Sequence, residues 1–131
     1  MFVDSSALVA ILLGEPEADK LADQMSSEHA PLITSPLAIF ETVAAVMRVK
    51  QISAAAADVR VRAVLTAAGI EVVAIDDAAS HAALDAFERY GKGRGHPAQL
   101  NMGDCFAYAL SRLHGVKLLY KGNDFARTDL G

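Results

Sequence analysis

The sequence predicts an α/β fold, in which a central parallel sheet of four or five strands has helices on both faces. Short β-type segments alternate with helical segments along the 131 residues, without an internal repeat or a low-complexity linker. Parallel strands need crossover connections of this kind. The chain has the size of one domain, and 53% of its residues are hydrophobic. Residues 1–131 are therefore expected to form a single domain with a substantial core.

Four segments have the composition of β-strands. They are residues 2–3, 31–35, 70–76 and 116–120. The segment with the sequence IEVVAID, residues 70–76, is the clearest of them. Its apolar residues run almost without interruption, so we expect a buried strand there.

Capping residues mark the ends of the expected helices, because serine, asparagine and proline favour the first turn and glycine favours the end. In the first half, the expected helices are residues 7–13 after Ser5 or Ser6 and before Gly14, residues 16–26 from Pro16, residues 36–49 after Ser35 with Pro36 in the first position, and an alanine-rich helix from Ser53 to Gly69. In the second half, a helix over residues 78–90 and a glycine-rich loop, residues 91–99, precede a helix that Asn101 caps and Gly115 ends.

Composition excludes several classes of protein. The apolar runs are shorter than the roughly 18 residues that span a bilayer, so a cytoplasmic protein without a membrane segment is expected. The single cysteine, Cys105, cannot form an internal disulfide and is interpreted as a small buried side chain, and the four histidines lack zinc-site spacing. The net charge of -4 argues against broad non-specific binding to nucleic acid, although a local basic loop could still guide a polyanion.

Four acidic residues lie at strand ends or on the connecting helices. Asp4 directly follows the first strand, and Asp124 lies just beyond the last. Glu41 is on the helix after the second strand, on a face that it shares with apolar residues, and Asp104 is in the first turn of the helix before the last strand. Ligands of open parallel sheets bind beyond the carboxyl ends of the strands. We expect the four acids to converge there.

A shared cation would explain such a cluster, because a buried carboxylate without a partner is costly. Mg²⁺ or Mn²⁺ prefers oxygen ligands and suits carboxylates without histidine. Each acid also has a purely structural interpretation. Asp4 can cap the first helix, and Asp104 can complement the helix dipole. Asp124 can be a turn residue, and Arg48 can neutralise Glu41. The convergence of all four on one edge favours the metal site.

Three stretches carry a family resemblance: FVDSSALVAILLGEPEA at the start, the glutamate in SPLAIFETVAAV, and HPAQLNMGDCFAYALSRLHGVKLLYKGNDFARTD at the end. They resemble the PIN-domain ribonucleases, specifically the VapC-type toxins of bacterial toxin–antitoxin pairs. The resemblance extends over the whole chain. It implies a PIN-like three-layer fold and a metal-dependent endoribonuclease that hydrolyses phosphodiester bonds in structured RNA, such as tRNA or rRNA.

The resemblance also implies roles for particular residues. The positions of the acidic quartet that holds one or two Mg²⁺ or Mn²⁺ ions are occupied by Asp4, Glu41, Asp104 and Asp124. Ser6 occupies a small hydroxyl position that lines the site, and Asp129 is interpreted as a surface or terminal residue. The implied partners are a cognate VapB-type antitoxin and a second copy of the chain, in a homodimer and a toxin–antitoxin hetero-oligomer. Apolar surface on the helices of the first half is expected to receive them.

Basic residues near the expected site are candidates for RNA contact. Lys92 and Arg94 lie in the flexible loop, where glycines let them reach phosphates. Arg112 and Lys121 are further candidates close to the acids. For the loop, an ordinary solvated segment is an equally good interpretation.

Two alternatives remain open from the residues alone. A receiver-like phosphoacceptor domain has the same size, the same alternation and a magnesium site, but it needs an acceptor aspartate after a central strand. Only Asp76 or Asp77 could serve, and such a domain has no use for Glu41 or Asp104. A catalytically silent binding module of the PIN fold is the other alternative, although all four acids are present.

Overall fold

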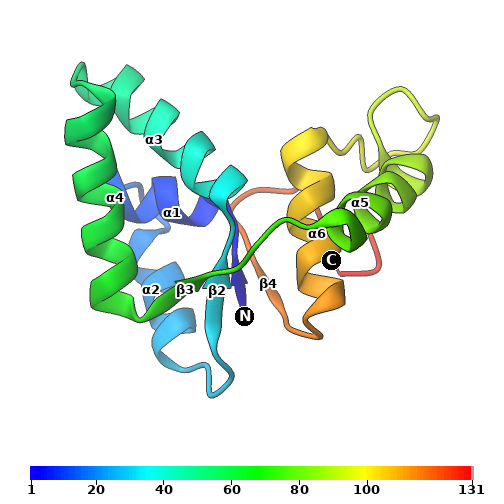
Figure 1. The fold of residues 1–131 in the computed structure, drawn as a ribbon, viewed down its shortest axis with the longest axis horizontal. Coiled ribbons are helices and arrows are strands. Elements are labelled where there is room, and N and C mark those ends of the chain that lie inside the picture. The colour runs from blue at the N-terminus through cyan, green and yellow to red at the C-terminus, as the bar shows by residue number, and fades with distance from the viewer. Residues whose placement is uncertain (131) are drawn as a thin grey trace.

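In the computed structural model, which describes residues 1–130, a parallel four-stranded sheet separates two layers of helices (Figure 1). The strands are β1 (Phe2–Val3), β2 (Leu32–Thr34), β3 (Ile70–Val72) and β4 (Leu118–Leu119). Their order in the sheet is β3-β2-β1-β4, and every pairing is parallel. Strand β1 is therefore central, with Phe2 paired to Ile33 on one side and to Leu118 on the other.

Four helices cover one face of the sheet and two cover the other. The first layer contains α1 (Ser5–Leu12), α2 (Ala18–Ser26), α3 (Pro36–Lys50) and α4 (Ala54–Ala68), and the second contains α5 (Asp77–Tyr90) and α6 (Met102–Leu113). Figure 1 shows the two layers on opposite sides of the strands. The predicted three-layer α/β fold is confirmed. None of the helices described within residues 1–130 combines the length and the hydropathy needed to cross a membrane.

The alternation of side chains along the short strands produces two separate cores. Phe2 packs in a core with α5 and α6, whereas its neighbour Val3 packs in a core with the helices of the first layer. Leu118 and Leu119 divide between the two cores in the same way. Successive side chains of a strand point to opposite faces, so strands of two or three residues are enough to fasten both layers to the sheet.

Most of the predicted helix caps are present. The side chains of Ser35, Ser53 and Asn101 accept hydrogen bonds from the backbone N–H three residues further on, which satisfies a donor that has no partner within the helix. Gly69 ends α4 with a left-handed φ of 70°, a conformation that costs glycine little.

The start of α1 agrees with one of the two predicted caps. The helix begins at Ser5, and its cap is Asp4, as the structural interpretation of that acid predicts, rather than Ser5 or Ser6, because the Asp4 carboxylate accepts the N–H of Ser6 at 3.1 Å. A carboxylate competes well for this position. Pro16 also lies before α2, in the turn that precedes its first residue, and not in the helix itself.

The prediction of a buried strand over residues 70–76 is wrong. Only Ile70–Val72 pairs in the sheet, as an edge strand, and Glu71 and Val72 are exposed. Val73 still donates its N–H to Thr34 O at 2.9 Å, after which the chain leaves the sheet to reach α5. The apolar residues beyond Val72 instead pack Val73 and Ile75 against the core of the second layer. The last strand is likewise shorter than predicted, at Leu118–Leu119.

Candidate active site at the carboxyl end of the sheet

The four predicted acids come from four different elements at one edge of the sheet. Asp4 ends β1 and donates its N–H to Leu119 O at 3.0 Å, which fixes it beside the end of β4. Glu41 lies in the second turn of α3, Asp104 in the first turn of α6, and Asp124 in the turn after β4. The chain leaves β1 toward one layer and enters β4 from the other, so this is the crevice where open parallel sheets bind ligands.

Ser6 holds the Asp4 carboxylate in place. Its hydroxyl donates to Asp4 Oδ2 at 2.5 Å, and its N–H donates to the same oxygen at 3.1 Å. The Ser6 hydroxyl also accepts the N–H of Lys121 at 3.0 Å, across 115 residues of sequence. One hydroxyl therefore joins Asp4 to the segment that carries Asp124, and the supporting role of Ser6 in the reaction stays a prediction.

Asp104 belongs to a capping box at the start of α6. Its backbone N–H donates to Asn101 Oδ1 at 2.9 Å, and its Oδ2 accepts the N–H of Asn101 at 3.1 Å. The reciprocal pair satisfies two donors and fixes the side chain against the first turn. Asp104 thus has a structural role as part of a capping box, which engages only one of its carboxylate oxygens.

Glu41 contacts the first turn of both other helices at the site. Its Oε1 accepts the Ser5 hydroxyl at 3.3 Å, and its carboxylate lies against Gly103, where a methyl group would collide with it. Arg48, the predicted partner, is exposed, and no ion pair joins it to Glu41 within residues 1–130. The proposed neutralisation of Glu41 by Arg48 is therefore wrong, because the arginine lies two turns further along α3, nearer its solvent-exposed end.

The electrostatics show that the carboxylates are close enough to interact. Desolvation is the main cause of the raised pKa of Asp104, which reaches about 7, and the charges of Asp124, Asp4 and Glu41 raise it further. Desolvation also raises the pKa of Asp4, with a contribution from Asp124, and the pKa of Glu41, with a contribution from Asp4. Like charges that oppose each other's ionisation mark a site where a cation would be bound favourably.

The raised pKa of Asp104 gives the metal-free protein a predictable dependence on pH. The pKa is 3.8 in the unfolded chain and about 7 in the folded protein, so the folded state binds more protons between these values. Its free energy of unfolding therefore falls as the pH rises from about 4 to 7. Asp104→Asn removes this effect. The full shift corresponds to about 4 kcal/mol, which solvent screening reduces to about 1–2 kcal/mol.

We accordingly expect the asparagine variant to be the more stable protein at pH 8 in EDTA and to match the wild type near pH 4. Urea unfolding at pH 4, 6 and 8 measures the difference. Asp85→Asn, an exposed site on α5, serves as the matched control. A stability difference that does not change with pH would contradict the raised pKa of Asp104.

The donor set fits a hard divalent cation. The hydrogen bonds described above engage Asp4 Oδ2, Glu41 Oε1 and Asp104 Oδ2, so each acid has a second oxygen available to a ligand. Among residues 1–130, no buried side-chain oxygen or nitrogen lacks a partner, so those second oxygens face accessible space. In the described part of the chain, no group of three or more acidic, histidine or cysteine side chains lies close enough together to hold a metal ion directly. Mg²⁺ commonly retains several waters and takes only one or two carboxylates directly, which such spacing permits.

The remaining predicted residues differ in their exposure and in their distance from the site. Asp124 is exposed, and Lys92 and Arg94 are exposed in the loop that leads into α6. Arg112 lies eight residues beyond Asp104, about 12 Å along the helix axis, and pairs with Asp129 at 3.3 Å. This position does not support its predicted place beside the acids.

The side chains of Lys121 and Cys105 contribute to ion pairing and packing within the fold. Lys121 pairs with Glu15 at 2.8 Å and with Glu17 at 3.5 Å, which ties the end of β4 to the turn before α2. Cys105 is buried, and desolvation raises the pKa of its thiol to about 11, so it remains protonated and packs as a small apolar side chain.

Sequence reasoning missed two residues at the site, Ser5 and Gly103. Ser5 was interpreted only as a cap, whereas its hydroxyl bonds Glu41 across 36 residues. The absence of a side chain at Gly103 lets α3 approach the first turn of α6. Glycine in a first helical turn next to an acid is the one signal that could have indicated this close approach.

Comparison with known proteins shows the family of the chain. The family model of the PIN domain matches residues 1–130. The chain belongs to the PIN-domain family. VapC ribonuclease R02377 of Rhizobium meliloti is 44% identical to it over 140 aligned positions, which cover 99% of each chain. Ribonuclease VapC42 of Mycobacterium tuberculosis is 36% identical and covers 99% of this chain and 96% of its own. These relatives place this PIN-domain chain in the VapC type.

A solved structure shows the same fold. The crystal structure of Mycobacterium tuberculosis VapC20, described as a Sarcin-Ricin loop cleaving toxin, matches with a TM-score of 0.75 and covers 98% of this chain and 94% of its own. The two sequences are 18% identical, so the likeness concerns the PIN fold. The receiver-like alternative is excluded by the family, and Asp76 follows the edge strand β3 and caps α5 rather than ending a central strand.

Proposed function

We propose that this VapC-type chain is a divalent-cation-dependent endoribonuclease that hydrolyses phosphodiester bonds in RNA and acts as the toxin of a type II toxin–antitoxin pair. The observation that supports the proposal best is the set of acids at the carboxyl end of the sheet, among which burial and the charges of neighbouring carboxylates raise the pKa values of Asp4, Glu41 and Asp104. The names of its full-length relatives, VapC ribonucleases, agree with it.

The residues that would hold Mg²⁺ or Mn²⁺ are Asp4, Glu41, Asp104 and Asp124. When bound, the cation would supply activation of water and neutralisation of the charge that develops on the phosphate. Other residues of the chain orient the carboxylates. Ser6 directs Asp4, Asn101 directs Asp104, and Ser5 directs Glu41, each through a hydrogen bond to one carboxylate oxygen. Asp124, the exposed acid, is accessible to the attacking water and to the substrate.

A structured RNA is the proposed substrate class, such as a tRNA or an rRNA. The similar VapC20 is described as cleaving the Sarcin-Ricin loop, an example of a structured target for the same fold. The carboxyl end of the sheet, where Asp124 is exposed, can admit a loop of RNA, because single-stranded loops offer their backbone and bases without the steric limits of a helix.

We propose that the loop over residues 91–99 binds the substrate backbone. Hydrogen bonds close its base, from Lys92 N to Leu100 O and from Leu100 N to Tyr90 O, both at 2.8 Å. Gly93 and Gly95 adopt left-handed φ values of 83° and 80°, which form its tip. The base lies beside the first turn of α6, so the exposed side chains of Lys92 and Arg94 project from a segment attached to the acid site.

Replacing Lys92 and Arg94 together with glutamine is expected to raise KM for RNA while leaving kcat within about twofold. Each lost phosphate contact should reduce the slope of log affinity against log salt concentration by about 1. Cleavage assays over a salt series measure both quantities. Lys117→Gln removes an exposed cation at the opposite end of β4 and is the control. An unchanged salt slope would show that the loop is an ordinary solvated segment that does not bind phosphates.

Gly103→Ala is expected to lower cleavage about 10-fold or more with little change in stability. The new methyl group would displace the Glu41 carboxylate, which is the flexible end of a side chain, while alanine favours the helix by about 1 kcal/mol. Single-turnover rates and thermal unfolding measure the two effects. In a Glu41→Gln background the same substitution should add little. Full activity in Gly103→Ala would show that Glu41 need not occupy this position.

Apolar surface outside the two cores supports the proposed protein partners. A groove of about 380 Å³ between α3 and α4 is lined by apolar residues that include Ile39, Phe40 and Met47, and Phe40 is 71% exposed. This is the first-half surface predicted from the sequence. A second apolar patch, with Leu84, Phe87 and Met102, lies on the other layer and was not predicted. We propose that a VapB-type antitoxin and a second copy of the chain cover these surfaces, because exposed patches of this kind mark interfaces.

The proposal is tested by incubating the purified protein with labelled tRNA and rRNA fragments in Mg²⁺ or Mn²⁺. Internal cleavage at defined positions, suppressed by the co-purified antitoxin, is the expected result. RNA binding without cleavage under all ionic conditions would instead support the silent binding module.

A further inference from the structure

Asp124 lies in a segment that has no helix or strand to hold it. Residues 121–130, here called the C-terminal segment, follow β4 as a series of bends and turns. Backbone hydrogen bonds within it span three residues, from Ala126 N to Asn123 O and from Thr128 N to Phe125 O. These bonds shape the segment locally but do not connect it to the rest of the protein. The location of Asp124 must therefore depend on anchors elsewhere.

The first anchor lies on the amino-terminal side of Asp124. The Lys121 N–H bonds the Ser6 hydroxyl, and the Lys121 ammonium bonds Glu15 at 2.8 Å. These contacts join the start of the segment to α1 and to the turn that follows it.

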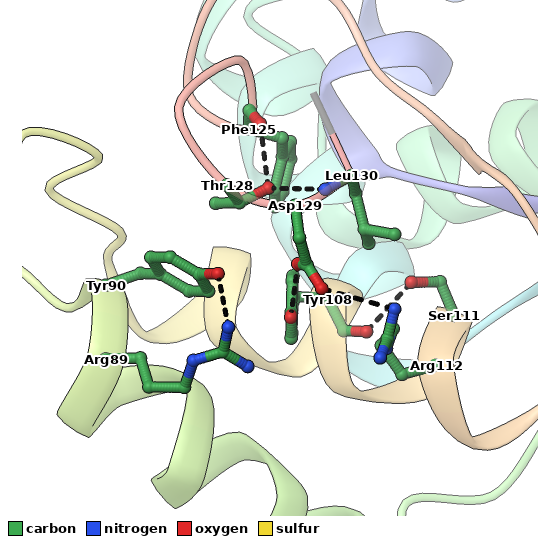
Figure 2. A network of polar contacts seen from close by, with 9 residues as sticks. All are labelled: Arg89, Tyr90, Tyr108, Ser111, Arg112, Phe125, Thr128, Asp129 and Leu130. Carbon is green, nitrogen blue, oxygen red and sulfur yellow. Dashed lines mark hydrogen bonds and ion pairs between the residues drawn. The ribbon is translucent and has the colours of Figure 1, made fainter.

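The second anchor lies on the carboxyl side of Asp124. The Tyr108 hydroxyl donates to Asp129 Oδ1 at 2.5 Å, and Arg112 pairs with Asp129 Oδ2 at 3.3 Å. Figure 2 shows Asp129 between these two side chains of α6. Phe125 is fully buried in the core of the second layer, with its ring edge-on to Tyr120 at 5.0 Å between centroids. Thr128 completes the turn by accepting the N–H of Leu130 at 3.1 Å and donating to Phe125 O at 2.8 Å.

Tyr108 connects this anchor to the acid site through α6. It lies four residues after Asp104, on the same face of the helix, and the residue is only 5% exposed. A hydroxyl that donates to a carboxylate makes a short, directional bond. The distance between Asp104 and the anchor of the C-terminal segment is therefore fixed by one rigid turn of helix.

We propose that Tyr108 and Asp129 are positioning residues that hold the C-terminal segment so that Asp124 faces Asp104 across the site. Asp129 does not act as a fifth acid of the site, because both of its oxygens are engaged with α6. The inference rests on the proposed function for the role of Asp124, but the placement of the segment is a property of the protein without RNA.

A double-mutant cycle, in which the affinity for Mn²⁺ is measured for each variant, tests the proposal without any RNA. Tyr108→Phe removes only the hydroxyl and is expected to weaken Mn²⁺ binding about 10-fold, the size typical of a lost partner behind a metal ligand. Asp124→Asn should weaken binding as well. If Tyr108 acts through Asp124, the double variant should be no weaker than Asp124→Asn, within about twofold. Isothermal titration calorimetry measures the affinities, with Tyr90→Phe as the matched control, since that buried tyrosine bonds Arg89 instead of the segment.

Variants of Asp129 and amide hydrogen exchange separate positioning from simple stabilisation. Asp129→Asn keeps an acceptor for Tyr108 and should retain most of the affinity, whereas Asp129→Ala should lose as much as Tyr108→Phe. The amides of residues 121–130 should exchange faster in Tyr108→Phe than in Tyr90→Phe. Cleavage should show a lower kcat in Tyr108→Phe with KM within about twofold.

Three results would overturn the inference. The first is a set of additive losses in the Mn²⁺ cycle, the second is unchanged exchange in the segment, and the third is a full loss in Asp129→Asn beside an unaffected Tyr108→Phe. Absence of RNA cleavage by the wild-type protein would contradict the proposed function alone, because the binding cycle and the exchange measurement need no substrate.

Discussion

Asp104→Asn is expected to lower the rate of RNA cleavage about 100-fold or more while the protein stays folded. Asparagine is nearly isosteric and can still accept the N–H of Asn101, so the capping box of α6 should persist. It removes, however, the charge of a carboxylate at the site whose pKa is raised to about 7, mainly by desolvation. Loss of a partner behind a metal ligand already costs about 10–100-fold, and loss of the ligand itself should cost at least as much. Asp4→Asn should behave in the same way.

Single-turnover cleavage of one labelled RNA, with circular dichroism on the same samples, measures the effect. Asp85→Asn makes the same chemical change on the exposed face of α5 and should be fully active. If Asp4→Asn and Asp104→Asn retained wild-type rates, the acids would have a structural role only.

Removal of divalent cations by EDTA is the second large effect, and we expect it to abolish cleavage. Without a cation, burial and the repulsion between the carboxylates oppose the ionisation of Asp4, Glu41 and Asp104. A bound cation would relieve that repulsion, so Mn²⁺ or Mg²⁺ should both restore activity and stabilise the fold. At a concentration 100 times Kd the stabilisation is about 2.7 kcal/mol.

Cleavage and thermal unfolding in EDTA, followed by titration with Mn²⁺, provide the measurement. The midpoint of unfolding should rise with Mn²⁺ in the wild type and rise much less in Asp104→Asn. Cleavage that persists at full rate in EDTA would exclude the metal mechanism, whatever the behaviour of the variants.

The fold and the edge of the sheet at which the acids lie could be predicted from the sequence, because both depend on local patterns. Serine and asparagine caps set the starts of α3, α4 and α6 through contacts over three residues, which are visible in the sequence. The alternation of strands with helices then required parallel pairing. Once the strands are parallel, Asp4 and Asp124 must lie at the same edge, because each follows the end of its strand.

The features that escaped prediction depend on contacts between distant parts of the chain. The contact of Glu41 with Gly103 and the bond between Tyr108 and Asp129 have no local signature. Asp129 was interpreted as a surface residue, and its ties to α6 became evident only from the structure. The limits of β3 also escaped, since an apolar run cannot reveal whether its residues pair in a sheet or cross it to pack on the opposite layer.

The division of the protein into two cores has a mechanical consequence. Asp4 and Glu41 belong to the first layer of helices and Asp104 to the second, and the layers are joined by strands of two or three residues and by the contact of Glu41 with Gly103. A cation shared by these acids would connect the two layers at the carboxyl end of the sheet. Any protein partner that tilted one layer against the other would then change the spacing of the acids without touching them.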